Sequence, residues 1–290
     1  MPIKTKKIFV WTDNDLDGAS SALLLKWIYS NYDVVIEEAF ETSFANKIKQ
    51  TDLSKYDKVF IVDLYVPDEA YKLIDLPKVT IIDHHQTHID VKDRYKKAKT
   101  IIELYSSAVK LIYDTYGKNV ELTPAQKAIV VFGNDYDSYA LKHKESLMYH
   151  AIHRAYNYPK VKRFVEAFDG GHRQFTPFEE NAVKLYIKRY KEQLNTDVYV
   201  GKFKDYKIIS CYATDAINEV AYHMLKKHNG DIVIVVNPTY QVVSFRKSKK
   251  CNAKLNVMAE KLCEGGGHDF AAGGKITEQF IEFTKILNKI

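Results

Sequence analysis

Three short apolar runs, each followed directly by acids or histidines, constrain the fold of this chain more than any other feature. Runs of this length are typical of strands buried in a parallel sheet. The carboxyl ends of parallel strands form the ligand crevice of an open sheet, so we expect the polar residues to face one another there. The runs and their polar followers are Lys7–Trp11 before Asp13-Asn14-Asp15-Leu16-Asp17-Gly18, Val59–Val62 before Asp63, and Val79–Ile82 before Asp83-His84-His85.

Strand and helix signals alternate through the first 140 residues. This alternation predicts an α/β fold, in which a parallel sheet carries helices on both faces. The expected helices are one after Gly18, one at 44–49 capped by Ser43, one opened by Pro67, one capped by Ser106 or Ser107, and one from Pro124 to a break at Gly133.

Residues 141–195 carry helical periodicity without a strand signal, and the alternation resumes after them. The longest helical stretch, Phe178–Leu194, could act as a spacer. A helix is also expected over Cys251–Cys263. We therefore predict a catalytic domain at 1–140, a helical segment and linker at 141–195, and a smaller α/β substrate-binding domain at 196–290.

The bulk composition permits a polyanionic partner without requiring one. The 43 basic and 37 acidic residues give a net charge of +6. The three cysteines are too few for a disulfide framework, and their number is odd, which favours a reducing cytoplasm. No apolar run approaches the roughly 20 residues of a membrane span, and no secretory segment is visible.

Five carboxylates and two histidines crowded at one sheet edge would repel one another unless cations were bound. The spacing of Asp13, Asp15 and Asp17 suits a hard cation, although the later Glu of a calcium loop is missing. The mixture of carboxylate and imidazole favours Mn²⁺, with Mg²⁺ as the alternative, over Zn²⁺. Asp135 or Asp137 could complete a site for two ions, bridged by Asp17 or Asp63.

A glycine-rich segment near the C-terminus suits phosphate binding, because glycine lets backbone N–H groups approach an anion closely. It comprises Gly265, Gly266 and Gly267, and His268 follows with a further donor. Arg246, after the run Val242–Phe245, could supply a bidentate contact to phosphate.

In this order, the motifs resemble those of the DHH phosphoesterases. The first motif, Asp63, Asp83-His84-His85 and the Asp135/Asp137 segment resemble their catalytic domain, and the stretch from Ser244 to His268 resembles their DHH-associated C-terminal domain. The family includes the exonuclease RecJ, the nanoRNases, cyclic-dinucleotide phosphodiesterases and a class of inorganic pyrophosphatases.

The resemblance implies a pair of Mn²⁺ or Mg²⁺ ions. By motif match, the catalytic residues are His85, which contacts the scissile phosphate, and its neighbour Asp83. Arg246 and His268 match positions that hold the substrate's phosphate or terminal nucleotide. Many relatives have His in place of Asp13. The implied metal ligands are Asp13, Asp15, Asp17, Asp63, His84 and Asp137, with Asp135 as the alternative to Asp137.

The function expected from the resemblance is a phosphodiesterase that degrades short single-stranded RNA or DNA to mononucleotides. Alternatives are a RecJ-like exonuclease on longer strands, a cyclic or linear dinucleotide phosphodiesterase, a pyrophosphatase-like enzyme and a non-catalytic binding protein. A homodimer is compatible with the sequence. The preference for RNA or DNA, the polarity of digestion and the biological role stay open.

Overall fold

The computed structural model describes residues 6–267 and 269–287. It divides the chain into two compact units, residues 1–183 and 184–290, with the division inside helix α9 (Pro177–Gln193). The linker predicted at 141–195 therefore contributes helices α7 (Lys144–Ala155) and α8 (Lys160–Ala167) to the first unit.

The first unit contains a five-stranded parallel sheet in the order β2-β1-β3-β4-β5. This confirms the predicted α/β class and parallel sheet. The strands are β1 (Lys7–Thr12), β2 (Asp33–Glu38), β3 (Lys58–Val62), β4 (Val79–Asp83) and β5 (Lys99–Ile102). The helices are α1 (Leu16–Ile28), α2 (Glu41–Gln50), α3 (Tyr71–Ile74), α4 (Gln86–Ile89), α5 (Ala108–Thr115), α6 (Pro124–Asp137), α7 (Lys144–Ala155) and α8 (Lys160–Ala167).

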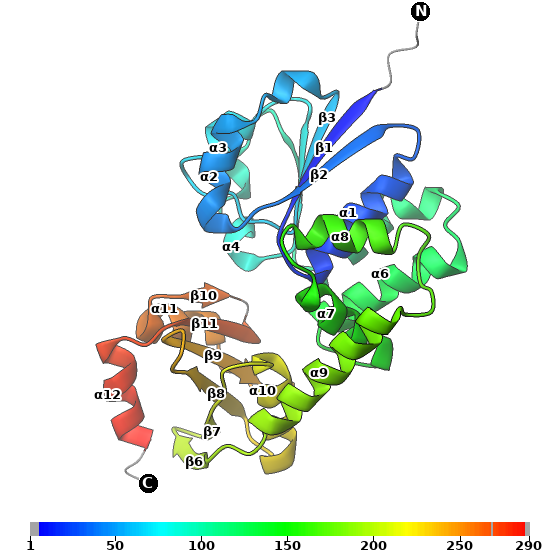
Figure 1. Ribbon diagram of the computed structural model, residues 1–290. Coiled ribbons are helices and arrows are strands. Elements are labelled where there is room, and N and C mark those ends of the chain that lie inside the picture. Colours follow the sequence, from blue (N-terminus) through cyan, green and yellow to red (C-terminus); the bar gives the residue numbers. More distant parts are fainter. Residues whose placement is uncertain (1–5, 268, 288–290) are drawn as a thin grey trace, which may run out of the picture. The chain divides into compact units, whose positions relative to one another are not determined.

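Helices cover both faces of this sheet, as the alternation predicts (Figure 1). Side chains of β1, β3 and β4 that point to one face pack with Phe44 and Ile48 of α2 and Ile74 of α3. Helices α1, α5 and α8 contact the strands from the other side. The centre of the sheet is thus dry on both faces, and the polar residues that follow its strands lie at one edge.

Four predicted helix boundaries were wrong. Helix α3 begins at Tyr71 rather than at Pro67. Helix α2 begins at Glu41, because Phe40 is the N-cap and Ser43 accepts a hydrogen bond from its N–H. Helix α11 begins at Leu255 rather than Cys251.

Helix α6 runs through Gly133 to Asp137 instead of ending at the glycine. A Cβ at Gly133 would lie 2.8 Å from Ser20 Oγ, so glycine serves the close packing of α6 on α1.

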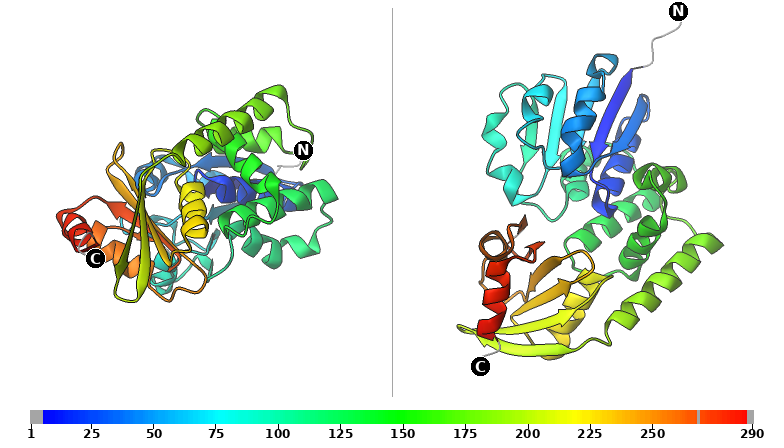
Figure 2. Two further views of the ribbon diagram at one scale, coloured as in Figure 1. Left: turned by 90° about the horizontal axis from the view of Figure 1, so that it is seen from below. Right: turned by 60° about the vertical axis from the view of Figure 1, so that its left-hand side comes forward.

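The second unit contains a six-stranded sheet in the order β10-β11-β9-β8-β7-β6. Helix α10 packs on one face, while α11 and α12 pack on the other (Figure 2). Strands β6 and β7 form an antiparallel hairpin. The elements are β6 (Val198–Phe203), β7 (Tyr206–Tyr212), α10 (Ile217–His228), β8 (Ile232–Asn237), β9 (Val242–Lys247), α11 (Leu255–Cys263), β10 (Gly266–Gly267), β11 (Ala271–Lys275) and α12 (Glu278–Leu287).

Within the described ranges, none of the helices combines the length and apolar character that a bilayer crossing needs.

Candidate metal centre

The turn between β1 and α1 is built around Asp15 and Gly18. Asp15 caps α1 by accepting a hydrogen bond of 2.8 Å from the Gly18 N–H. A Cβ at Gly18 would lie 2.4 Å from the carbonyl oxygen of Asp13, so only glycine allows the loop to fold back this tightly. The turn brings the first three acids of the sequence to the end of β1, with Asp17 in the first turn of α1.

Asp17 ties two distant segments together in the protein interior. Its carboxylate accepts hydrogen bonds from the N–H groups of Ala108 (2.6 Å) and Val109 (2.9 Å), which begin α5. Ser107 caps the same helix, as one of the two predicted alternatives. The positive N-terminal end of α5 stabilises the buried charge of Asp17.

Asp63 leaves β3 in a conformation that non-glycine residues rarely adopt, with φ of 54°. Its side chain is buried, and its Oδ1 receives no hydrogen bond from the described residues. A strained backbone and a buried, unsatisfied carboxylate oxygen are both costly, which is typical of a functional site.

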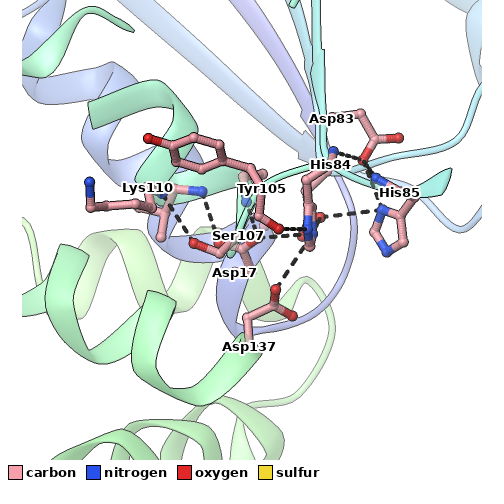
Figure 3. Close-up of polar contacts among 12 residues, drawn as sticks. Asp17, Asp83, His84, His85, Tyr105, Ser107, Lys110 and Asp137 are labelled. Atoms are coloured by element: carbon pink, nitrogen blue, oxygen red, sulfur yellow. Dashed lines mark hydrogen bonds and ion pairs between the residues drawn. The ribbon is translucent and has the colours of Figure 1, made fainter. Parts of the chain in front are cut away.

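Three carboxylates surround one ring nitrogen of His84, and Figure 3 shows Asp17 and Asp137 beside this ring. Its Nε2 lies 3.3 Å from Asp63 Oδ1, 3.6 Å from Asp17 Oδ2 and 3.5 Å from Asp137 Oδ2. On the other side of the ring, Nδ1 faces the carbonyl oxygen of Tyr105 at 3.4 Å, where it can only donate. This tautomer turns the lone pair of Nε2 towards the carboxylates.

The pKa values around His84 show that the carboxylates resist ionising together. Burial and then the charge of Asp17 raise the pKa of Asp63 well above its usual value, and the same causes raise that of Asp137. Burial and the charge of Asp15 raise the pKa values of Asp13 and Asp17 to about 7. Burial and the charge of His85 lower the pKa of His84 to about 4, so its imidazole is neutral.

These residues fit divalent cations. Asp17, His84 and Asp137 offer ligand atoms within 4.8 Å of one another, and so do Asp63, Asp83, His84 and His85. A cation would remove the repulsion among the carboxylates and give the unbonded oxygen of Asp63 a partner. Oxygen ligands with one imidazole suit Mn²⁺ or Mg²⁺.

Asp83 faces an imidazole nitrogen with each of its two oxygens. Oδ1 accepts from the His84 N–H at 2.7 Å and faces His85 Nδ1 at 2.8 Å, while Oδ2 faces His88 Nδ1 at 2.6 Å. Burial opposes the charge of Asp83, but His85 holds its pKa far below the usual range. We therefore read Asp83 as a partner of His85 rather than as a metal ligand.

His85 is held as a cation at the edge of the site. Burial lowers its pKa, but the charge and hydrogen bond of Asp83 outweigh this effect and raise it to about 9. Its side chain is 37% exposed, in contrast to the 4% of His84. The two adjacent histidines thus have opposite properties: one is neutral and buried, and the other is charged and accessible.

The two candidate acids of α6 point to different neighbours. Asp137 faces His84, whereas Asp135 accepts hydrogen bonds from the N–H groups of Lys142 and His143 (both 3.0 Å) and from Ser146 Oγ (2.6 Å). Asp135 therefore holds the turn into α7, and the geometry favours Asp137 as a ligand.

The predicted substrate-binding residues share one corner of the second unit's sheet. Arg246 lies opposite Ala271 in the β9–β11 ladder, and its guanidinium donates to the side chain of Asn218 and to the Phe245 carbonyl (2.8 Å). Gly266 and Gly267 form β10, where Gly267 has φ of 127°, and a Cβ at Gly265 would lie 2.0 Å from the Gly273 carbonyl oxygen. His268 lies outside the described residues.

Sequence reasoning missed His88, Tyr95 and the carbonyl of Tyr105. His88 follows His84 by four residues, and this spacing is the one signal that the sequence offered. Tyr105 contributes a main-chain atom, so its residue type carries no signal.

Two family models match the chain. The model of the DHH family, N-terminal domain, matches residues 7–134, and that of the DHHA1 domain matches residues 205–290. No curated protein sequence matches the chain.

Solved structures with this fold have little sequence identity to the chain. A pGpG-specific phosphodiesterase, PggH from a Vibrio species, is 16% identical with a TM-score of 0.57, over 97% of each chain. An exopolyphosphatase-related protein from Bacteroides fragilis is 17% identical with a TM-score of 0.56, over 98% of this chain and 92% of that one.

RecJ from Thermus thermophilus in complex with Mn²⁺ is 13% identical with a TM-score of 0.58, over 98% of this chain and 51% of that one. These likenesses concern the fold, while the two model matches cover both units of the chain. The chain therefore belongs to the DHH family, with a DHH N-terminal domain followed by a DHHA1 domain.

Proposed function

We propose that this protein is a metal-dependent phosphodiesterase that degrades short single-stranded oligonucleotides to mononucleotides. The observation that carries the proposal is the His84 Nε2 atom surrounded by three carboxylates, beside a cationic and accessible His85. Relatives of this fold act on related phosphodiesters, since one is a pGpG-specific phosphodiesterase and another is the exonuclease RecJ.

Two divalent ions, Mn²⁺ or Mg²⁺, would be held by the acids and the imidazole of the first unit. When bound, they would polarise the phosphoryl oxygens and activate a water. We assign Asp137 rather than Asp135 to the ligands, because Asp135 is occupied by the α6–α7 turn. The proposed ligands are Asp13, Asp15, Asp17, Asp63, His84 and Asp137.

His85 would contact the scissile phosphate. Its Nδ1 faces Asp83, so the proton on Nε2, across the ring, is the one that a substrate can meet. An imidazolium there can donate to a phosphate oxygen and protonate the leaving oxygen, a contribution typically worth about 10²–10⁴-fold in rate.

In the second unit, Arg246 and the segment Gly265–Gly267 would bind the terminal phosphate or nucleotide, together with His268. Arginine suits bidentate contacts to phosphate, and the glycines expose backbone N–H groups. The modest net charge of +6 favours a short substrate, since tracking of a long polyanion usually needs a strongly basic groove.

Hydrolysis of end-labelled RNA and DNA oligonucleotides of increasing length, from two to about twenty nucleotides, tests the proposal in the presence of Mn²⁺ or Mg²⁺. We expect mononucleotide products and the highest kcat/KM on the shortest oligomers. Comparable rates on long strands would favour the RecJ-like alternative. Parallel assays with cyclic dinucleotide and pyrophosphate test the other two enzymatic alternatives.

A His85→Gln variant separates the role of His85 in catalysis from metal binding. It keeps a polar side chain at a position that is not among the proposed metal ligands, so we expect normal Mn²⁺ binding and a rate lower by about 10²-fold or more. Hydrolysis by this variant at the wild-type rate would contradict the role of His85. Absence of hydrolysis by the wild type on every substrate would contradict the proposed function itself.

A further inference from the structure

His88 lies outside the proposed metal ligands, yet both of its ring nitrogens are engaged. It belongs to α4 and is fully buried. Nδ1 lies 2.6 Å from Asp83 Oδ2, and Nε2 lies 2.9 Å from the hydroxyl of Tyr95. A buried histidine bonded at both nitrogens has a fixed ring plane and tautomer.

The direction of these hydrogen bonds follows from Arg94. Its Nη2 atom lies 3.0 Å from the oxygen of the Tyr95 hydroxyl and can only donate. The hydroxyl proton is therefore left to point to His88 Nε2, and His88 donates from Nδ1 to Asp83. Burial raises the pKa of Tyr95 to about 12, so this hydroxyl keeps its proton at neutral pH.

Arg94 itself is firmly held. Its guanidinium lies over the rings of Tyr65, Tyr71 and Tyr95, with centroids 5.0–5.6 Å away. It also donates to Asp68 Oδ1 at 2.7 Å and to the carbonyl oxygen of Val66. The series of hydrogen bonds thus starts at a donor whose position is fixed by stacking and by several acceptors.

The series ends at His85. Asp83 Oδ1 faces His85 Nδ1 at 2.8 Å, and Oδ2 faces His88. The Asp83 carboxylate therefore bridges the two rings, with the His84 N–H as a further donor to Oδ1. Rotation of the carboxylate would break the contacts to both imidazoles.

We propose that His88 is a positioning residue for His85: with Tyr95 and Arg94 it holds the Asp83 carboxylate in the plane that orients the catalytic imidazole. This inference rests on the proposed function for the role of His85, but the orientation itself is measurable without substrate. His88 neither binds the ions nor meets the substrate in this assignment.

Two substitutions separate positioning from simple packing. In His88→Asn, the amide nitrogen occupies the place of Nδ1 and can still donate to Asp83. In His88→Gln, the amide reaches the place of Nε2 and leaves Asp83 Oδ2 without its donor. Both variants remove the ring from the same buried site, so a purely structural role predicts similar effects on activity and stability.

We expect His88→Gln to lower kcat by about 10–100-fold and to leave the KM for oligonucleotide unchanged. Losses of this size are typical when a residue that orients a ligand or catalytic side chain is replaced. His88→Asn should retain kcat within about threefold of the wild type. Tyr95→Phe, which removes only the hydroxyl, should lie between them. Equal losses in the Asn and Gln variants, or wild-type kcat in the Gln variant, would overturn the proposal.

The substrate-free measurement is the imidazole N–H spectrum of nitrogen-15-labelled protein, recorded with and without Mg²⁺. The His85 Nδ1–H signal should be strongly hydrogen-bonded and slow to exchange in the wild type and in His88→Asn, and weakened in His88→Gln. An unchanged His85 signal in the Gln variant refutes positioning even if no substrate is found. An altered signal in a protein that hydrolyses nothing would support the orientation and count against the proposed function alone.

Discussion

Asp63 Oδ1 lies 3.3 Å from His84 Nε2, two buried acceptor atoms facing each other at the end of adjacent strands. The tautomer of His84 places no proton between them, and the carboxylates of Asp17 and Asp137 lie close to the same nitrogen. Such an arrangement is unfavourable in the protein alone and favourable around a cation.

Asp63→Asn should stabilise the metal-free protein and abolish its response to metal. Asparagine removes a buried charge that its neighbours repel, and it tolerates the positive φ at this position. In chelator, we expect a melting temperature equal to or above that of the wild type. Saturating Mn²⁺ should raise the melting temperature of the wild type only. A less stable variant in chelator would contradict the repulsion.

The metal-free wild type should lose stability as pH rises through the acidic range. The pKa values of Asp13 and Asp17 are raised from 3.8 to about 7, so these groups bind protons more strongly in the folded state. Their contribution is full below pH 4 and is lost between about pH 4 and 7. Urea denaturation in chelator should show this slope, and Mn²⁺ should flatten it.

Asp137→Asn and Asp135→Asn form a matched pair, two residues apart on α6. The first should reduce Mn²⁺ binding and activity with little change in folding. The second should leave Mn²⁺ binding intact and cost about 1–3 kcal/mol of stability, because Asp135 satisfies two N–H groups and a hydroxyl at the turn into α7. Calorimetric Mn²⁺ titration and urea denaturation distinguish them, and an Asp135 variant that loses metal would reverse the assignment.

The sequence predicted the sheet and most acids of the site because both depend on local signals. Buried parallel strands are continuous apolar runs, and Asp63 and Asp83 follow them directly. It could not separate Asp135 from Asp137, since that choice depends on where the α6–α7 turn places its N–H groups. The roles of His88 and Arg94 could not be predicted for the same reason, because they depend on contacts with residues that folding brings close.

Gly133→Ala should destabilise the protein despite the better helix propensity of alanine. The added Cβ would lie 2.8 Å from Ser20 Oγ, 3.0 Å from Ser20 Cβ and 3.3 Å from Val109 Cγ1. Overpacking of this kind costs about 1–3 kcal/mol, against a propensity gain of about 1 kcal/mol. Urea denaturation measures the balance. A stabilised variant would show that α1 and α6 can separate without cost.

Glu179 should give the folded protein a second, opposite dependence on pH. Arg173 donates to both of its oxygens at 2.8 Å, and the N–H of Thr176 and the hydroxyl of Tyr156 also donate to it. Burial opposes the charge, but these donors, led by Arg173, lower the pKa of Glu179 from 4.5 to about 2.

A lowered pKa stabilises the folded state above the unfolded value, and this contribution is lost as pH falls from about 4.5 to 2. A shift of this size corresponds to at most about 3 kcal/mol. Glu179→Gln should therefore be less stable than the wild type at pH 7, and the difference should shrink towards pH 2. A constant difference in unfolding free energy across this range would show that the ionised carboxylate contributes nothing, and that packing around α9 alone accounts for the loss.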